Sequence, residues 1–295
     1  MDTAQILKTA SNALLSLQGQ DVDVLTIHEP KDFEYAKHLS RVISKLSPLI
    51  GNILEYSIIT FLNNIEEWKD YGKWVRQDPG FPDTLFVGKI EPKPGIEIKT
   101  WFPLATEITA RFKDSQSHFQ FNQTNVAVVA WLPENIIYGK PKIIDVWVDS
   151  AISLTEARDR HYHNPPDYLV FEPEDTSNRT VNLQQTNTNG YKFQGTPQQL
   201  TEAERIVKSW GKNGKIYSHS KEYQQKLKTL LGRFPYRLDT NFAKIDRIMH
   251  KSLEAFKIKV LNTKILDYTI IEWSKVITSE DETKLNQFLF EALGK

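Results

Sequence analysis

The chain has no cysteine, no long apolar run and no net charge. Without cysteine it can form neither disulfide bonds nor zinc–thiolate sites. No apolar run is long enough to span a bilayer, so no membrane partner is expected. The balance of 37 basic and 37 acidic residues argues against tight, non-specific binding to nucleic acid, although it leaves room for a local basic patch.

At 295 residues the chain is long enough to bury a full hydrophobic core. We expect a single domain over residues 1–295, with residues 196–295 as a candidate helical subdomain. The first residues, Met1 to Gln5, lack the basic and apolar regions of a secretory signal. Together with the lack of cysteine, this favours a cytoplasmic protein.

Hydrophobic periodicity predicts an α/β fold. Apolar residues recur at helical spacing in four N-terminal segments, 4–18, 31–46, 50–65 and 105–117. Segments rich in β-branched or apolar residues predict strands at 84–87, 95–102, 125–132 and 142–149. Beyond residue 201 we expect helices at 202–210, 221–231, 241–258 and 280–293, with one more strand at 265–273. The expected architecture is a central mixed β-sheet flanked by helices, with a mainly helical C-terminal part.

Two acids and a lysine gather around the connection between the first two predicted strands. Asp83 precedes the strand 84–87, and Glu97 and Lys99 lie within the strand 95–102. Because side chains alternate between the two faces of a strand, Glu97 and Lys99 share one face and lie roughly 7 Å apart. The three charged side chains are therefore a candidate site.

The position of Asp83 depends on the register of this hairpin. A tight turn leaves Asp83 well past Glu97, whereas a wide loop that pairs Val87 with Gly95 puts Asp83 opposite Lys99 and diagonal to Glu97. The loop 88–94 contains two prolines, which cannot donate ladder hydrogen bonds. We therefore expect the wide loop, and with it a site that includes Asp83.

Two carboxylates beside a lysine suit the hydrolysis of a phosphodiester bond. A hard cation such as Mg²⁺ prefers carboxylate oxygens and water, and it neutralises the charge that develops on the phosphate. Asp83 and Glu97 could hold the ion, and the Ile98 carbonyl between the two strand residues could add a ligand. Lys99 could orient or polarise the attacking water.

Pro82-Asp83 followed by Glu97-Ile98-Lys99 resembles the motif of the PD-(D/E)XK nuclease superfamily, in its type II restriction endonuclease branch. The resemblance implies a restriction-endonuclease-like sheet flanked by helices, Mg²⁺-dependent cleavage of double-stranded DNA, and a homodimer. By the same resemblance Asp83 and Glu97 are metal ligands and Lys99 is the catalytic lysine. Glu55, on the helix predicted before the site, matches a glutamate that many members carry, and the resemblance makes it a further candidate metal ligand.

A second informative segment, residues 178–195, is dense in amides and hydroxyls and contains few charges. Asn and Gln can pair with adenine in the major groove, and Thr can contact the thymine methyl group. Asn189-Gly190 is a turn signal, so a β-ribbon or loop could enter a groove. The candidate DNA-binding residues are Asn182, Gln184, Gln185, Thr186, Asn187, Asn189, Lys192 and Gln194.

Other interpretations of the same residues stay open. Glu97 and Lys99 could form an exposed ion pair on an ordinary strand, with Asp83 as a turn residue. A repair or junction-resolving nuclease would use the same core but read DNA shape, and a DNA-binding module could keep the core without catalysis. The sequence shows no nucleotide-binding glycine loop and no nucleophilic triad that can be recognised from spacing.

Overall fold

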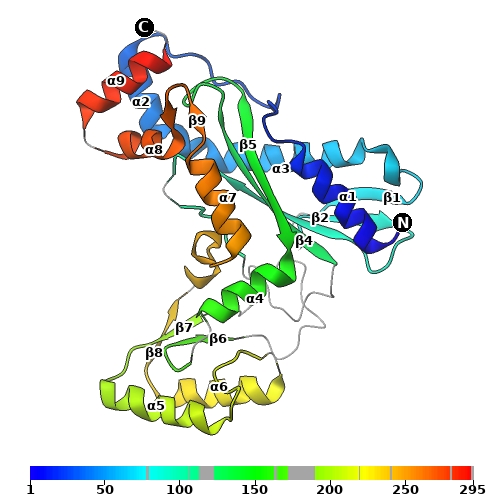
Figure 1. Cartoon of the computed structure of the whole chain (residues 1–295), viewed down its shortest axis with the longest axis vertical. Coiled ribbons are helices and arrows are strands. Elements are labelled where there is room, and N and C mark those ends of the chain that lie inside the picture. Colours follow the sequence, from blue (N-terminus) through cyan, green and yellow to red (C-terminus); the bar gives the residue numbers. More distant parts are fainter. Residues whose placement is uncertain are drawn as a thin grey trace.

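A five-stranded mixed sheet organises the computed structural model of the chain (Figure 1). The structure describes residues 1–77, 80–105, 107–112, 123–162, 165–171, 190–218, 220–239, 241–279 and 281–293. The strands lie in chain order and are β1 (Gly72–Arg76), β2 (Thr84–Gly88), β3 (Gly95–Trp101), β4 (Thr124–Pro133) and β5 (Pro141–Ser150). Strands β3 and β4 are parallel and the other neighbours are antiparallel. The predicted α/β class with a central mixed sheet is confirmed.

The helices are α1 (Thr3–Leu15), α2 (Phe33–Val42), α3 (Ser47–Asn63), α4 (Ala151–Tyr162), α5 (Pro197–Ser209), α6 (Lys221–Arg233), α7 (Lys251–Leu261), α8 (Ile270–Thr278) and α9 (Glu282–Ala292). Several begin where the sequence supplies a cap. Asp2, Thr196 and Thr269 each form a capping box at the start of α1, α5 and α8. Within the described residues no helix is long and apolar enough to cross a membrane.

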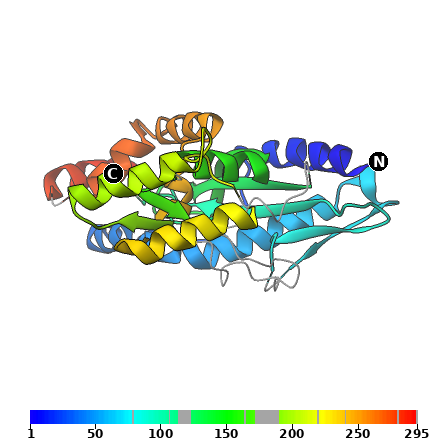
Figure 2. The ribbon, with the colours of Figure 1, turned by 90° about the horizontal axis from the view of Figure 1, so that it is seen from below.

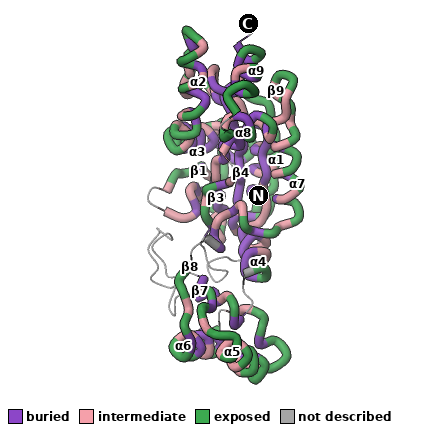
Figure 3. Tube along the Cα trace, turned by 90° about the vertical axis from the view of Figure 1, so that its left-hand side faces the viewer, coloured by how far each residue is buried: buried purple, intermediate pink, exposed green. Residues whose placement is uncertain are grey.

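Two hydrophobic clusters cover the two faces of the main sheet. Side chains of α1 and of the second half of α3 pack with Ile96 and Ile98 on one face. Helices α4, α7, α8 and α9 contribute to the cluster around Val126 and Val128 on the other face. Figure 2 shows α3 on one side of the strands and α4 and α7 on the other, and Figure 3 shows the buried positions concentrated along the sheet. Strand β4 is thus buried on both faces, as its apolar sequence predicts.

A smaller sheet with its own core forms the far end of the molecule (Figure 1). Its strands are β6 (Tyr168–Val170), β7 (Gly190–Phe193) and β8 (Tyr236–Asp239), all antiparallel. Helices α5 and α6 pack on this sheet through a cluster that includes Leu169, Phe193 and Leu227. In contrast, α7 to α9 return to the main sheet, with the short β9–β10 hairpin (Lys264–Ile265 and Tyr268–Thr269) before α8. The mainly helical C-terminal part is therefore shared between two cores.

The helix predicted at 105–117 is wrong over its described residues, which are extended or irregular. Arg111 bridges Lys244, and the Phe112 N–H donates to the Ala243 carbonyl at 2.7 Å. Ile108 and Phe112 are fully buried by this pairing. The tertiary contacts therefore override a helical pattern that β-branched residues already weaken.

The C-terminal boundaries also differ from the prediction. The helix expected at 241–258 begins only at Lys251, because 3₁₀ turns at 241–243 and 245–247 bury Phe242 and Ile245. The strand expected at 265–273 becomes a two-residue strand pairing followed by α8. The Thr269 cap, with Glu272 completing the capping box, starts the helix inside the apolar run.

One glycine fixes how closely α3 approaches the strand of the candidate site. A Cβ atom at Gly51 would lie 2.5 Å from the Thr100 Oγ1 atom on β3. Gly51→Ala should therefore destabilise the fold by about 1–3 kcal/mol, which urea unfolding can measure. Adding Thr100→Ala should restore most of the loss, because it removes the clashing atom.

Gly232, near the end of α6, offers a matched control for this experiment. Nothing lies within 4 Å of a Cβ atom built there. Gly232→Ala should be neutral or stabilise by up to about 1 kcal/mol, because alanine favours a helix more than glycine does. An equal loss of stability in both variants would contradict the close packing of α3 on β3.

Candidate active site

The hairpin between β2 and β3 brings Asp83 level with Glu97. The ladder pairs Leu85 with Gly95 and Thr84 with Ile96, so the next position in register sets Asp83 beside Glu97. The wide connection is therefore the correct one, but the predicted register was two residues off. Strand β2 continues past this short pairing against β1 alone, because the prolines of the loop cannot extend a ladder with β3.

Two hydrogen bonds from backbone N–H groups hold the two carboxylates in place. The Ile98 N–H donates to Asp83 Oδ2 at 2.7 Å, and the Asp83 N–H donates to Glu97 Oε2 at 3.1 Å. Beyond Ile96 no β2 residue pairs with β3, so the Asp83 side chain satisfies a backbone donor at an open sheet edge. Both carboxylates are thereby oriented toward this edge.

Lys99 joins the two acids, as predicted from strand alternation. Its Nζ atom lies 3.6 Å from Asp83 Oδ2 and forms an ion pair with Glu97 Oε1. The side chains are only 16%, 18% and 8% exposed for Lys99, Asp83 and Glu97. Because the three side chains are largely buried, water screens their charges less than on an open surface. The attraction between Lys99 and the two carboxylates is correspondingly stronger. The structure brings Asp83, Glu97 and Lys99 together at one point.

Glu55 on α3 lies within electrostatic reach of Asp83 and Lys99 but has a hydrogen-bond partner of its own. Arg76 on β1 donates from Nε to Glu55 Oε1 at 2.8 Å. Burial raises the pKa of Glu55, the Arg76 hydrogen bond opposes that rise, and the negative charge of Asp83 adds to it. Arg76 was not predicted. The sequence feature that could have pointed to it is its position on β1, two residues after the buried Trp74, which gives it the same face of the strand as Trp74.

The donor set at this edge is small. Among the residues that the structure describes, no three or more His, Cys, Asp or Glu side chains are grouped to hold a metal ion. Glu55 therefore does not complete a three-carboxylate set with Asp83 and Glu97. The remaining donors are the two carboxylates and the strand backbone, and Mg²⁺ is commonly held by one or two carboxylates plus water.

The predicted DNA-binding segment is only partly described. Asn182, Gln184, Gln185, Thr186, Asn187 and Asn189 lie outside the described residues. Lys192 and Gln194 are exposed, on and just after β7 of the small sheet. Lys192 pairs across the sheet with Arg237 on β8, so two exposed cations are neighbours on adjacent strands. Sequence reasoning missed Arg237, because the partner strand lies more than forty residues further along the chain.

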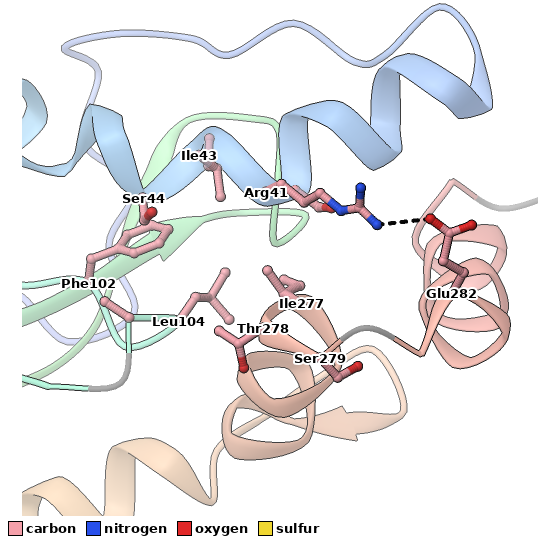
Figure 4. Close-up of a pocket in the computed structure, with 11 residues that line it drawn as sticks. Arg41, Ile43, Ser44, Phe102, Leu104, Ile277, Thr278, Ser279 and Glu282 are labelled. Carbon is pink, nitrogen blue, oxygen red and sulfur yellow. Dashed lines mark hydrogen bonds and ion pairs between the residues drawn. The ribbon is translucent and has the colours of Figure 1, made fainter.

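A separate cavity of about 680 Å³ lies between α2, the residues after β3 and the end of α8 (Figure 4). The Arg41–Glu282 ion pair, at 3.0 Å, links α2 to α9 beside it. Its hydroxyl groups, such as those of Ser40 and Thr278, donate to backbone carbonyls of their own helices. None of Asp83, Glu97 and Lys99 lines this cavity, so the acid–lysine cluster is the better candidate for chemistry.

Comparison with protein-family models, curated proteins and solved structures gave no match to this chain. The functional argument therefore depends on the geometry of the acid–lysine cluster and on the chemistry of its residue types.

The raised pKa of Glu55 makes a stability prediction. The folded protein holds the Glu55 proton more tightly than the unfolded chain does, so ionisation of this carboxyl costs stability as the pH rises above about 4.5. Glu55→Gln removes that cost. The stability of the variant relative to the wild type should therefore increase between about pH 4 and pH 7, measured by urea unfolding at several pH values.

The exposed Glu67→Gln variant controls for the loss of one negative charge. Its stability relative to the wild type should change less over the same pH range. A relative stability of Glu55→Gln that stays flat or falls with pH would contradict the assigned effect of burial.

Proposed function

We propose that this protein is a Mg²⁺-dependent endonuclease that hydrolyses phosphodiester bonds of double-stranded DNA, as a type II restriction enzyme of PD-(D/E)XK type. The convergence of Asp83, Glu97 and Lys99 at an open sheet edge is the observation that carries the proposal. The central mixed sheet flanked by helices is the fold that the resemblance implies. A simple surface ion pair would not need two carboxylates held by backbone donors around one lysine.

The donors at the edge fit a hard cation. The Ile98 N–H points toward Asp83, and in a β-strand the N–H and C=O of one residue point to the same side. The Ile98 carbonyl therefore faces the same edge as the Asp83 and Glu97 carboxylates, which gives three oxygen donors of the type that Mg²⁺ takes. When bound, the ion would neutralise the charge that develops on the phosphate.

Lys99 has two roles in this proposal. In the structure its ammonium group supplies the positive charge between the two carboxylates. With substrate present, the same group lies where it can hydrogen-bond an attacking water and stabilise the hydroxide character that the water acquires. Glu55 and Arg76, one layer behind, would tune the electrostatic potential around Asp83.

The remaining parts of the proposal concern partners. The cations Lys192 and Arg237 on the small sheet, with Gln194, would contact the DNA, since phosphate contacts position a protein on a duplex and amides read base edges. Cutting both strands of a symmetric site calls for two active sites, so a homodimer is part of the proposal. We place this activity in the cytoplasm, where DNA is available and proteins rarely depend on disulfide bonds.

Cleavage tests the proposal directly. The purified protein should cut phage DNA into discrete fragments with Mg²⁺ and leave it intact with a chelator. Lys99→Ala should lower the cleavage rate by about 100-fold or more, because the stabilised water is lost. Lys73→Ala, an exposed lysine on β1, should cut like the wild type. Equal cutting by Lys99→Ala would remove its assigned part, and a smear in place of fragments would favour a shape-reading nuclease.

Metal binding gives a measurement that does not depend on activity. Calorimetry should detect Mg²⁺ binding to the wild type, and Asp83→Asn or Glu97→Gln should weaken it by about tenfold or more, because each removes a charged ligand. Lys99→Met should strengthen the binding, since it removes a cation that competes for both carboxylates. A wild type that binds no Mg²⁺ would point instead to a DNA-binding module without catalysis.

A further inference from the structure

A second group of reactive side chains lies where β5, α4 and α7 meet. His250 directly precedes α7, and its Nε2 atom lies 2.8 Å from the Oγ atom of Ser153 in the first turn of α4. Its other ring nitrogen, Nδ1, lies 3.2 Å from the Oγ atom of Ser252. Asp149 at the end of β5 accepts a hydrogen bond from Ser252 at 3.2 Å. A serine, a histidine and a carboxylate are thus connected in space from three separate elements.

The hydrogen bonds around His250 fit the tautomer that carries its proton on Nδ1. The Trp147 Nε1–H already donates to the Ser252 oxygen at 2.9 Å, and the single Ser252 proton goes to Asp149. With the Ser252 proton directed to Asp149, the His250 Nδ1 atom is the donor toward Ser252. Its Nε2 atom is then the free base that faces the Ser153 hydroxyl, which is the tautomer that activates a serine.

The surroundings suit the charges that such a reaction would create. The Asp149 Oδ2 atom lies 3.8 Å from His250 Nε2, close enough to stabilise an imidazolium ion. The Trp147 ring packs edge-on against the imidazole, with centroids 5.7 Å apart, and restricts its rotation. Ser153 also lies in the first turn of α4, whose N–H groups have no acceptor within the helix and can stabilise an oxyanion.

This cluster is separate from the acid–lysine cluster of the proposed nuclease. Across the main sheet, Glu97 pairs with Val126 and Val126 pairs with Asp149. Asp149 therefore lies two strands from Glu97, roughly 10 Å away at the usual strand spacing. The three side chains share one face of the sheet, and the fully buried Val126 lies between the two groups.

We propose that Ser153 is an activated nucleophile and that this cluster hydrolyses small carboxylic esters, with His250 as the general base. Ser153 Oγ bonds to the ester carbonyl carbon as its proton passes to His250 Nε2. The bond between that carbon and the alkoxy oxygen then breaks, and the leaving alcohol takes the proton from His250. Water, deprotonated by the same imidazole, then attacks the acyl carbon. The bond between that carbon and Ser153 Oγ breaks, Oγ takes the proton back from His250, and the carboxylic acid leaves. Ser252 and Asp149 are positioning residues that hold the ring.

A fluorophosphonate probe and p-nitrophenyl acetate test the proposal on the full chain. Peptide mass spectrometry should find the phosphonyl group on Ser153, and Ser153→Ala should lose this adduct and about 99% of the esterase activity. Ser57→Ala is the matched control, because Ser57 is a helical serine that donates only to a carbonyl of its own helix. His250→Gln should lower the labelling rate by about 100-fold, the usual contribution of a general base.

The wild type alone also discriminates, should His250→Gln fail to fold. Its phosphonyl adduct should form on Ser153 and not on Ser57, the helical serine without a histidine partner. An unlabelled Ser153, equal labelling of Ser153 and Ser57, or equal labelling in folded His250→Gln would each overturn the proposal. The labelling needs neither DNA nor Mg²⁺, so failure of the nuclease proposal would leave this result unaffected.

Discussion

The one-sided pairing of β3 is the constraint on which the candidate nuclease site depends. On one side β3 pairs with β4 along its whole length, but on the other it pairs with β2 at only two positions. The next backbone donor on that side would be left without a partner, and buried N–H groups are costly to leave unpaired. The Asp83 carboxylate fills the place that a third strand residue would have taken.

Because the Asp83 side chain takes the place of a strand residue at this edge, the three charged groups Asp83, Glu97 and Lys99 converge. A carboxylate drawn to the open edge brings negative charge beside Glu97, and the two acids then need a cation nearby. Lys99 supplies it from the same strand, because alternation gives it the same face as Glu97. The open edge of β3 thus accounts for the position of Asp83, and the two neighbouring acids account for the lysine beside them.

The sequence was informative where the pattern was local. Strand alternation correctly joined Glu97 to Lys99, and the prolines correctly excluded a tight hairpin. It failed where distant contacts decide. The pairing of 110–112 with 243–245 replaces a predicted helix, and the cluster around His250 unites residues about a hundred positions apart. Spacing alone carries no signal for such a constellation, since each of its members is an ordinary polar residue until the fold brings them together.

The small sheet formed by β6, β7 and β8 has a hydrophobic core distinct from those of the main sheet. Regions with separate cores open as separate cooperative units, each with its own free energy of opening. Amide hydrogens of β6 to β8, α5 and α6 should therefore exchange as one group, at a rate set by the smaller core. The small sheet, which carries Lys192 and Arg237, can therefore unfold locally while the strands around Asp83 and Glu97 keep their hydrogen bonds.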